Sequence, residues 1–446
     1  MGQRAGMTHP SVIENVTCLG CGCACDDIDV VVASGRIVEA RNACRLGLRW
    51  FGDGQVPSVV RVDGGDVTLE EAMRSAVTRL VEAERPLVFL APGLSCEAQR
   101  EAVAVADLLR ARLDSITTST ALPFTLASQE HGHASATLGE VRNRADVVVF
   151  WGIDLAERYP RFASRYAPGP PGTHVPEGRR TRTVIAVDIG RATASIDADV
   201  RLAVEPANEL ATLIALEALA RSPDTSSRYA SLADRPWNSA RELAAVLLSA
   251  RYVGLVYDAE PDDRSTRTPV RFEALASLAQ TLNDRTRCAA LALRAGGNRS
   301  GSDSVLVAQT GYPCAVDFAR GYPRYDPHSS PLGVLAHVAD TALVVGDPTG
   351  VPSEVSGLTH LETVMIGPRA STVAFGERCV VIDTGVDGIH ASGTALRTDD
   401  IPLPLRAPLA GPRSTAETVR AVKLAIRRLR PAGSGVGGAG RRALGV

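Results

Sequence analysis

The chain has 446 residues, which is too long for one ordinary domain and predicts two to four. Hydrophobic residues make up 45% of it and the formal net charge is −2, so the composition gives no indication of a nucleic-acid or membrane partner. No apolar run reaches the roughly 18 residues of a membrane helix, and residues 1–17 contain no apolar signal segment. We therefore expect a cytoplasmic protein with reduced cysteines.

A cysteine-rich loop lies close to the N-terminus. Cys18, Cys21, Cys25 and Cys44 follow the spacing C-x2-C-x3-C-x18-C, and Cys23 falls outside it. Four thiolates that converge from a tight loop and one remote position suit a [4Fe–4S] cluster or a Zn²⁺ ion. Two evenly spaced pairs would favour zinc, whereas here one trio is tight and the fourth cysteine stands alone. We predict a [4Fe–4S] cluster on these four residues, with zinc, an empty site and free thiols as the alternatives.

The stretch after the loop predicts a small domain. Two β-rich runs, residues 28–32 and 36–38, flank Ser34-Gly35 and indicate a hairpin. The hairpin would carry Cys44 back to the first three cysteines, so we interpret residues 1–55 as a metal-stapled iron–sulfur domain. Thr68 then precedes an acidic first turn, which predicts the N-cap of a helix.

From residue 86 onward, short apolar runs alternate with helical segments. Many of these runs end in Gly or Asp, residues that bind ligands at strand ends but are also simply good turn formers. The alternation predicts an α/β fold with two interleaved, doubly wound domains. We assign residues 56–112 and 300–410 to the first and residues 113–299 to the second. The predicted strands are residues 86–91, 146–152, 183–188, 253–258, 342–347, 363–367 and 379–383.

Three segments have no such pattern. Residues 166–182 are rich in Pro, Gly and Arg and predict an exposed loop. Residues 222–236 are polar and predict a linker, and the Gly-rich residues 431–446 predict a disordered tail.

Several stretches together resemble the B subunit of formylmethanofuran dehydrogenase, within the molybdopterin oxidoreductase superfamily. The resemblance runs from about residue 16 to about residue 428. It rests on the cysteine loop with Asn42 to Arg45, and on Thr137 to Asp146, Gln309 to Pro313, Val316 to Tyr325 and Ala391 to Pro402. The last three are highly specific to that family.

The resemblance implies an N-terminal [4Fe–4S] domain followed by two interleaved α/β domains of the molybdopterin-oxidoreductase type. Active family members hold molybdenum or tungsten on a bis-pterin guanine dinucleotide, ligated by a Cys or selenocysteine that a His follows. They reduce CO2 to formate, which an amidohydrolase partner condenses onto methanofuran.

This chain departs from that pattern at the metal ligand. The Cys-His pair is expected near Thr120 and Ala121, but residues 117–126 contain neither residue type, and no cysteine lies between Cys96 and Cys288. A neutral hydroxyl is a poor ligand for a soft redox metal. Asp154 replaces an amide of the family, and we expect it to repel a phosphate-bearing cofactor.

We find no other catalytic candidate nearby. His131 and His133 do not fit the expected pair, and we interpret them as surface or packing residues.

These losses resemble the B subunit of the bacterial formyltransferase/hydrolase complex of methylotrophy, which moves a formyl group from a pterin carrier to a furan carrier and releases formate. That resemblance implies a non-catalytic scaffold with three partners: an amidohydrolase-like A subunit, a framework C subunit, and a formyltransferase D subunit. We predict no catalytic or cofactor-binding residues, a [4Fe–4S] cluster, and no Mo/W pterin. The alternatives are an active Mo/W formylmethanofuran dehydrogenase B subunit, and a stand-alone metal-binding module.

Overall fold

A computed structural model describes residues 10–222, 235–263, 267–328, 332–373 and 376–429. The chain divides into two compact units. Unit 1 comprises residues 1–55, 116–304 and 392–410, and unit 2 comprises residues 56–115, 305–391 and 411–446. Unit 1 contains the cysteine loop together with residues 392–410, which we had assigned to the first α/β domain. The predicted tail and most of the predicted linker lie outside the described residues.

Unit 1 begins with a small antiparallel sheet. Its strands β1 (Ser11–Val16), β2 (Ile28–Ala33) and β3 (Arg36–Arg41) pair in the order β1-β2-β3. The predicted hairpin is confirmed: it turns at Ser34 and Gly35, whose φ angles are 51° and 71°. Helix α1 (Arg45–Phe51) follows β3. A two-stranded sheet of β18 (Gly393–Leu396) and β19 (Pro402–Leu405) completes this part, where Leu19 packs against Ala395 and Leu405.

The larger sheet of unit 1 has five parallel strands in the order β10-β9-β8-β11-β12. Strands β9 and β10 lie on one side of β8, and the later strands β11 and β12 lie on its other side. The boundary between β8 and β11 is therefore the topological switch point of a doubly wound fold. The strands are β8 (Val147–Trp151), β9 (Thr183–Ile189), β10 (Val200–Val204), β11 (Tyr252–Asp258) and β12 (Arg287–Leu293).

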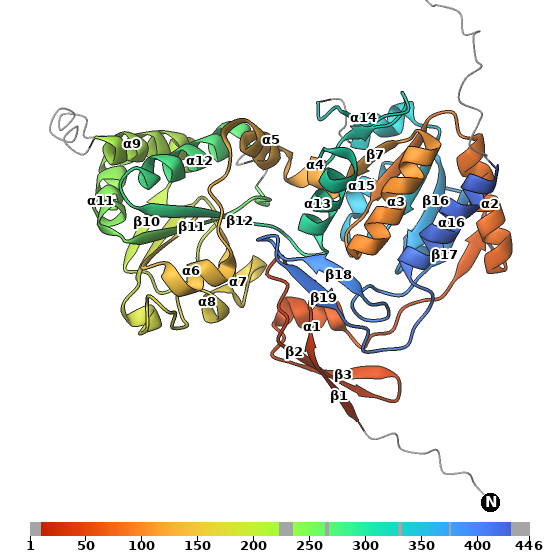
Figure 1. Ribbon diagram of the computed structural model, residues 1–446, viewed down its shortest axis with the longest axis horizontal. Helices are drawn as coiled ribbons and strands as arrows, with labels where there is room; N and C mark the ends of the chain where they lie inside the picture. Colours follow the sequence, from red (N-terminus) through yellow and green to blue (C-terminus); the bar gives the residue numbers. More distant parts are fainter. Residues whose placement is uncertain (1–9, 223–234, 264–266, 329–331, 374–375, 430–446) are drawn as a thin grey trace, which may run out of the picture. The chain divides into compact units, whose positions relative to one another are not determined.

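Helices cover both faces of this sheet. Alternate strand residues such as Val149, Val187 and Leu255 pack against one helical layer, because side chains alternate between the two faces of a strand. Figure 1 shows α9, α11 and α12 on one face and α6, α7 and α8 on the other. The helices of this unit are α4 (Ile116–Thr120), α5 (Leu122–His131), α6 (Leu138–Arg144), α7 (Leu155–Arg158), α8 (Phe162–Arg165), α9 (Glu209–Arg221), α11 (Arg235–Ser249) and α12 (Pro269–Asn283), with short 3-10 turns at η1 (Gly178–Arg180) and η2 (Pro206–Asn208).

Unit 2 contains a nine-stranded sheet in the order β14-β13-β7-β6-β15-β16-β17-β4-β5. Its five central strands, β7, β6, β15, β16 and β17, are parallel to one another. Each strand outside them pairs antiparallel with its neighbour. The strands are β4 (Val60–Val62), β5 (Gly65–Asp66), β6 (Pro86–Leu90), β7 (Arg112–Ser115), β13 (Val316–Asp317), β14 (Arg324–Tyr325), β15 (Thr341–Val345), β16 (Glu362–Gly367) and β17 (Cys379–Asp383).

Three long helices of unit 2, α2 (Leu69–Glu82), α3 (Cys96–Leu109) and α16 (Thr415–Leu429), pack on one face of this sheet (Figure 1). The predicted N-cap is confirmed, because the Thr68 hydroxyl and Glu71 form a capping box at the start of α2. The remaining elements are α13 (Arg299–Thr310), which spans the boundary between the units, α14 (Leu332–Val338), α15 (Pro352–Ser356), η4 (Pro348–Gly350) and η5 (Ala370–Thr372).

The expectation that residues 166–182 form an exposed loop was only partly right, since about half of these residues are exposed and others are buried. Within residues 166–182, the side chains of Tyr166 and Val175 are buried, and the guanidinium of Arg182 is buried as well. Arg182 donates hydrogen bonds to the carbonyl oxygens of Ala145, Pro168 and others. The segment therefore folds around one arginine, which satisfies carbonyl groups that a regular element would otherwise pair.

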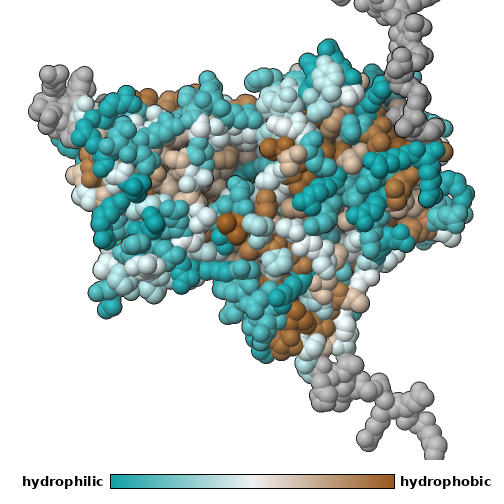
Figure 2. Space-filling model, in the orientation of Figure 1, coloured by the Kyte–Doolittle hydropathy of each residue, from teal (hydrophilic) through white to brown (hydrophobic). Residues whose placement is uncertain are grey.

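The α/β prediction is confirmed by these sheets and helices. No helix within the described ranges is long and apolar enough to cross a membrane. Figure 2 shows a mainly hydrophilic face with smaller hydrophobic patches, as is usual for a protein surface in contact with water.

Candidate metal centre and switch-point crevice

The cysteine loop is a closed backbone structure between β1 and β2. The amide of Cys18 donates to the carbonyl of Cys25 at 2.8 Å and closes the base of the loop. Inside it, the amide of Ala24 donates to the carbonyl of Cys21 at 3.1 Å, and Ala24 adopts a positive φ of 38°. The loop thus has a fixed conformation that is maintained by its own backbone.

Two glycines let other segments approach this loop. A Cβ atom on Gly20 would lie 2.9 Å from the carbonyl oxygen of Leu46, and one on Gly22 would lie 2.1 Å from that of Arg294. The Gly22 amide in turn donates to the Arg294 carbonyl at 3.1 Å. These glycines therefore provide room for close backbone packing, which fixes the loop against α1 and against the end of β12.

The structure places the four predicted ligands near one another. Cys44 is the N-cap residue of α1, and α1 brings it to the loop. Burial raises the pKa of the Cys18 thiol well above its usual value, and the charges of Cys21, Cys25 and Cys44 raise it further. That all three act on Cys18 means that the four sulfurs share one small region. Their binding of a metal stays a prediction.

The arrangement of the sulfurs bears on which metal would fit. In the described part of the chain, no three of these cysteine sulfurs lie within 4.8 Å of one another. A tetrahedral Zn²⁺ ion with bonds of about 2.3 Å needs its sulfur ligands about 3.8 Å apart. A cluster of several atoms holds its thiolates farther apart than a single ion does. The all-sulfur donor set suits an iron–sulfur cluster or a Zn²⁺ ion, and the choice of a cluster stays a prediction.

The fifth cysteine has a separate role. Cys23 is almost fully buried, and its thiol is hydrogen-bonded to Cys21. This hydrogen bond lowers the pKa of Cys21 and, together with burial, raises that of Cys23 well above its usual value. Cys23 thus acts as a neutral hydrogen-bond donor to Cys21, one of the predicted ligands.

Two arginines of α8 and its flank face the loop. Arg161 and Arg165 form ion pairs with Asp27 and Asp26. Burial raises the pKa of Cys25, and a hydrogen bond from Arg165 partly opposes that rise. Cations close to buried thiols stabilise their thiolate forms, which are the forms that bind metals.

The position expected for a Mo or W ligand lies in the short helix α4. The Thr120 hydroxyl donates to the carbonyl of Ile116 at 2.9 Å and accepts from Arg299 Nη1 at 3.3 Å. Ala121 is fully buried. Nearby, Thr117 accepts from Arg294 Nη2 at 3.0 Å. Both hydroxyls are therefore engaged within the protein.

A buried ion-pair network adjoins these threonines. Glu260, which follows β11 and is 2% exposed, binds both Arg294 and Arg299, and Arg294 also pairs with Asp303 at 2.5 Å. Burial would raise the pKa of Glu260, but the two arginines outweigh it and hold that pKa at about 2. We did not predict this network, since the apolar run of β12 and the arginine that follows it were not identified.

A crevice of about 630 Å³ lies at the switch point, along the carboxyl ends of β8, β9 and β11. It is lined by acids and bases together, among them Asp154, Arg158, Arg191, Asp262, Asp263 and Arg271.

Arg271 is the most informative residue of the crevice. Its side chain is 5% exposed, and its Nε donates to Glu209 at 2.8 Å. Its Nη1 has no hydrogen-bond partner among the described residues. Gly152 has a φ of 51°, and a Cβ there would lie 2.9 Å from Arg271 Nη2. The crevice thus offers an anion one buried N–H donor, on an arginine whose charge is already paired with Glu209.

These features only partly suit a pterin dinucleotide that carries a redox metal. Arg271 would suit a phosphate, whereas residues 117–126 around Thr120 contain no cysteine that could serve as a soft ligand. Our expectation that Asp154 repels such a cofactor was too simple. Its carboxylate caps α7 by accepting from the Glu157 amide at 2.9 Å, and it shares the crevice with three arginines. The residues present do not fit the metal centre as a whole.

The two histidines lie where packing and surface residues do. His133 contacts Phe124 edge-on, and its Nε2 lies 3.2 Å from the Tyr257 hydroxyl. His131 is exposed beside Glu130 and Glu273, and ligand atoms of these three lie within 4.8 Å of one another. Exposed acidic groups commonly gather without an ion, and we assign no metal to them.

Known proteins with similar sequences indicate the family to which this chain belongs. No model of a protein family matches the chain. The chain is 29% identical over 432 residues to the B subunit of the tungsten-containing formylmethanofuran dehydrogenase 2 of Methanococcus maripaludis, covering 94% of this chain and 99% of that one. It is 30% identical over 433 residues to the protein of the same name from Methanocaldococcus jannaschii, with the same coverage.

A solved structure shares the fold. The X-ray structure of the formyltransferase/hydrolase complex from Methylorubrum extorquens, in complex with methylofuran, contains a chain that matches with a TM-score of 0.70 at 22% identity. The match covers 83% of this chain and 99% of that one. Since identity of 30% extends over nearly the full length of a curated relative, the chain belongs to the family of formylmethanofuran dehydrogenase B subunits.

Proposed function

We propose that this chain is a non-catalytic framework subunit of a formyltransferase/hydrolase complex that releases formate in one-carbon metabolism. The observation that carries the proposal is the hydrogen bonding of the Thr120 hydroxyl. This residue stands where the family resemblance expects the metal-binding cysteine, and its hydroxyl is engaged by Ile116 and Arg299. The fold likeness to a chain of the Methylorubrum complex supports the choice of complex.

The chemical argument concerns the redox metal. Molybdenum and tungsten in such enzymes need a soft, deprotonated ligand that sets their potential. A neutral threonine hydroxyl does not provide one, and Ala121 next to it provides no general acid or base. We infer that the chain binds no Mo/W pterin and reduces no CO2.

We further propose a [4Fe–4S] cluster on Cys18, Cys21, Cys25 and Cys44. When bound, such a cluster supplies electron transfer, but without a redox centre its use here is structural. A metal that binds only the folded site adds its binding free energy to folding. The small three-stranded sheet beside the loop has little core of its own and would gain from such a staple.

The proposed partners follow from the same complex. They are an amidohydrolase-like subunit, a formyltransferase subunit, and a second framework subunit. The first two would carry the hydrolysis and formyl-transfer steps. We place the complex in the cytoplasm, a choice that the nine free cysteines support.

The second candidate is an active dehydrogenase subunit. The unpartnered Nη1 of Arg271 in the switch-point crevice favours it, because a phosphate of a dinucleotide would satisfy that group. It would require a metal ligand other than Thr120.

The two candidates are separated by purification of the tagged chain from its own cell. The framework proposal expects the three partner subunits in near equal amounts and formyl-transfer activity that ends in formate. In this complex, Thr120→Val should change that activity by less than about twofold, because the lost hydroxyl makes hydrogen bonds only within unit 1. Recovery of the chain alone, with full partner activity in its absence, would defeat the framework proposal and favour a stand-alone module.

A further inference from the structure

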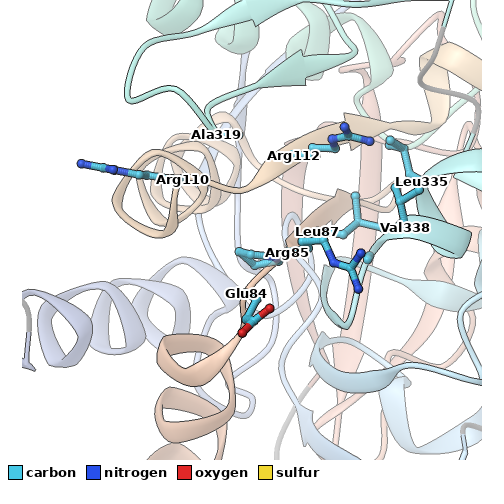
Figure 3. Close-up of a pocket in the computed structure, with 10 residues that line it drawn as sticks. Glu84, Arg85, Leu87, Arg110, Arg112, Ala319, Leu335 and Val338 are labelled. Atoms are coloured by element: carbon cyan, nitrogen blue, oxygen red, sulfur yellow. The ribbon is translucent and has the colours of Figure 1, made fainter. Parts of the chain in front are cut away.

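A second pocket lies in unit 2, at the edge of the nine-stranded sheet where β6 and β7 begin. It has a volume of about 130 Å³. Its floor is apolar and includes Leu87 and Leu335, both buried, and Val338, which is 38% exposed. Its rim includes Arg85 and Arg112 (Figure 3). Parallel strands bind small ligands at their carboxyl ends, so this pocket lies at the edge that such ligands do not use.

The size of the pocket limits what it holds. Sites for substrates and cofactors usually measure about 300–1,000 Å³. An engineered cavity of about 150 Å³ takes up one benzene molecule. A pocket of about 130 Å³ therefore accommodates one bulky apolar side chain and not a whole cofactor.

The rim gives the pocket a positive character. Arg85 is exposed and forms no ion pair in the described part of the chain, while Asp340 fixes its backbone amide at 2.9 Å. Arg112 lies 3.7 Å from Asp317 and forms an ion pair with it. Arg110 is also exposed and extends away from the other labelled side chains in Figure 3. Against these cations stands one lining acid, Glu84.

We propose that this pocket docks an acidic segment of a partner subunit, which inserts one bulky apolar side chain over Leu87 and places its carboxylates on Arg85 and Arg110. The proposal rests on the proposed function in one respect, that the partner belongs to the same complex. A buried apolar anchor surrounded by a charged rim is the usual arrangement of an interface hot spot. The rim charges select a partner of opposite charge and speed its encounter.

Photo-cross-linking identifies the occupant directly. Ala319 lines the pocket and is exposed. We replace it with a benzophenone-bearing residue in the tagged chain within its own cell. The expected product joins residue 319 to a co-purifying partner, within a stretch that is net acidic and contains a Leu, Ile, Met or aromatic residue. A cross-link only to a second copy of this chain, or to no protein, contradicts the proposal.

Charge reversal measures the contribution of the rim. Arg85→Glu should weaken binding of the isolated partner about tenfold or more at low salt, and less at high salt because ions screen exposed charges. The matched control is Arg241→Glu, an exposed arginine on α11 in unit 1, which should leave the affinity unchanged. Ala319→Trp, which fills the pocket, should weaken binding at both salt concentrations.

The outcomes separate this inference from the function on which it rests. If the wild-type chain recovers no partner, the proposed function fails and the docking proposal fails with it. If the wild-type chain assembles, and the variants Arg85→Glu and Ala319→Trp assemble as well as the wild type does, only the docking proposal is wrong.

Discussion

The surroundings of His133 determine its charge. Burial beside Phe124 and Tyr257 lowers the pKa of this histidine from 6.5 to about 4. The folded chain therefore keeps His133 neutral at pH 5, where the unfolded chain protonates it. Because the unfolded state binds more protons between pH 6.5 and pH 4, stability falls as the pH falls through that window.

This gives a prediction for the pH dependence of unfolding. Between pH 7.5 and pH 5, the titration of His133 should remove about 2 kcal/mol of stability. His133→Gln should abolish that part of the decrease, as measured by urea unfolding at the two pH values. His174→Gln, which changes an exposed histidine, should leave the decrease as it is in the wild type. Parallel curves for wild type and His133→Gln would contradict the assignment.

Single residues also mark the limit of what the sequence predicts. The four cysteines that we predict as ligands could be selected from their spacing, because loop and hairpin are local, and the structure places their thiols near one another. Arg271 could not be selected, since it is one of many arginines and its importance depends on Gly152 and Glu209, which are distant in sequence. Only folding brings these three together.

Among the elements, the segments that follow β11 and β12 carry the buried network around Glu260. Removing one partner of a buried ion pair leaves an uncompensated charge, which typically costs about 3–5 kcal/mol. Glu260→Gln should therefore destabilise unit 1 by about that amount, measured by chemical unfolding. Asp53→Asn, in the exposed pair with Arg36, should cost at most about 1 kcal/mol. Equal effects of the two substitutions would show that the network is not held as the structure has it.

The prediction of elements succeeded where the pattern was strong. The apolar runs that became β6, β8 and β11 are bounded by turn residues, and each is a buried strand. The run 287–293 was missed, although it is equally apolar, because it is rich in alanine, which favours a helix. Residues 166–182 are exposed only in part, because one buried arginine, Arg182, binds two of their carbonyl groups, which composition does not reveal.

At the scale of the whole molecule, the α/β class followed from the alternation of strands and helices, but the division of the chain did not. Residues 392–410 belong to unit 1 because β18 and β19 pack with Leu19 of the cysteine loop. That contact joins segments almost 400 residues apart, and no local pattern encodes it. The family resemblance was the stronger guide at this scale, since its motifs extend over most of the chain.

The central claim is that this family member serves as a framework without a molybdenum or tungsten centre. Elemental analysis of the native complex, purified through the tagged chain, tests it most directly. We expect about four iron atoms per chain, as one [4Fe–4S] cluster contains, and Mo and W far below one atom per chain. Stoichiometric molybdenum or tungsten, together with formate oxidation linked to a viologen dye, would contradict the account and identify an active dehydrogenase.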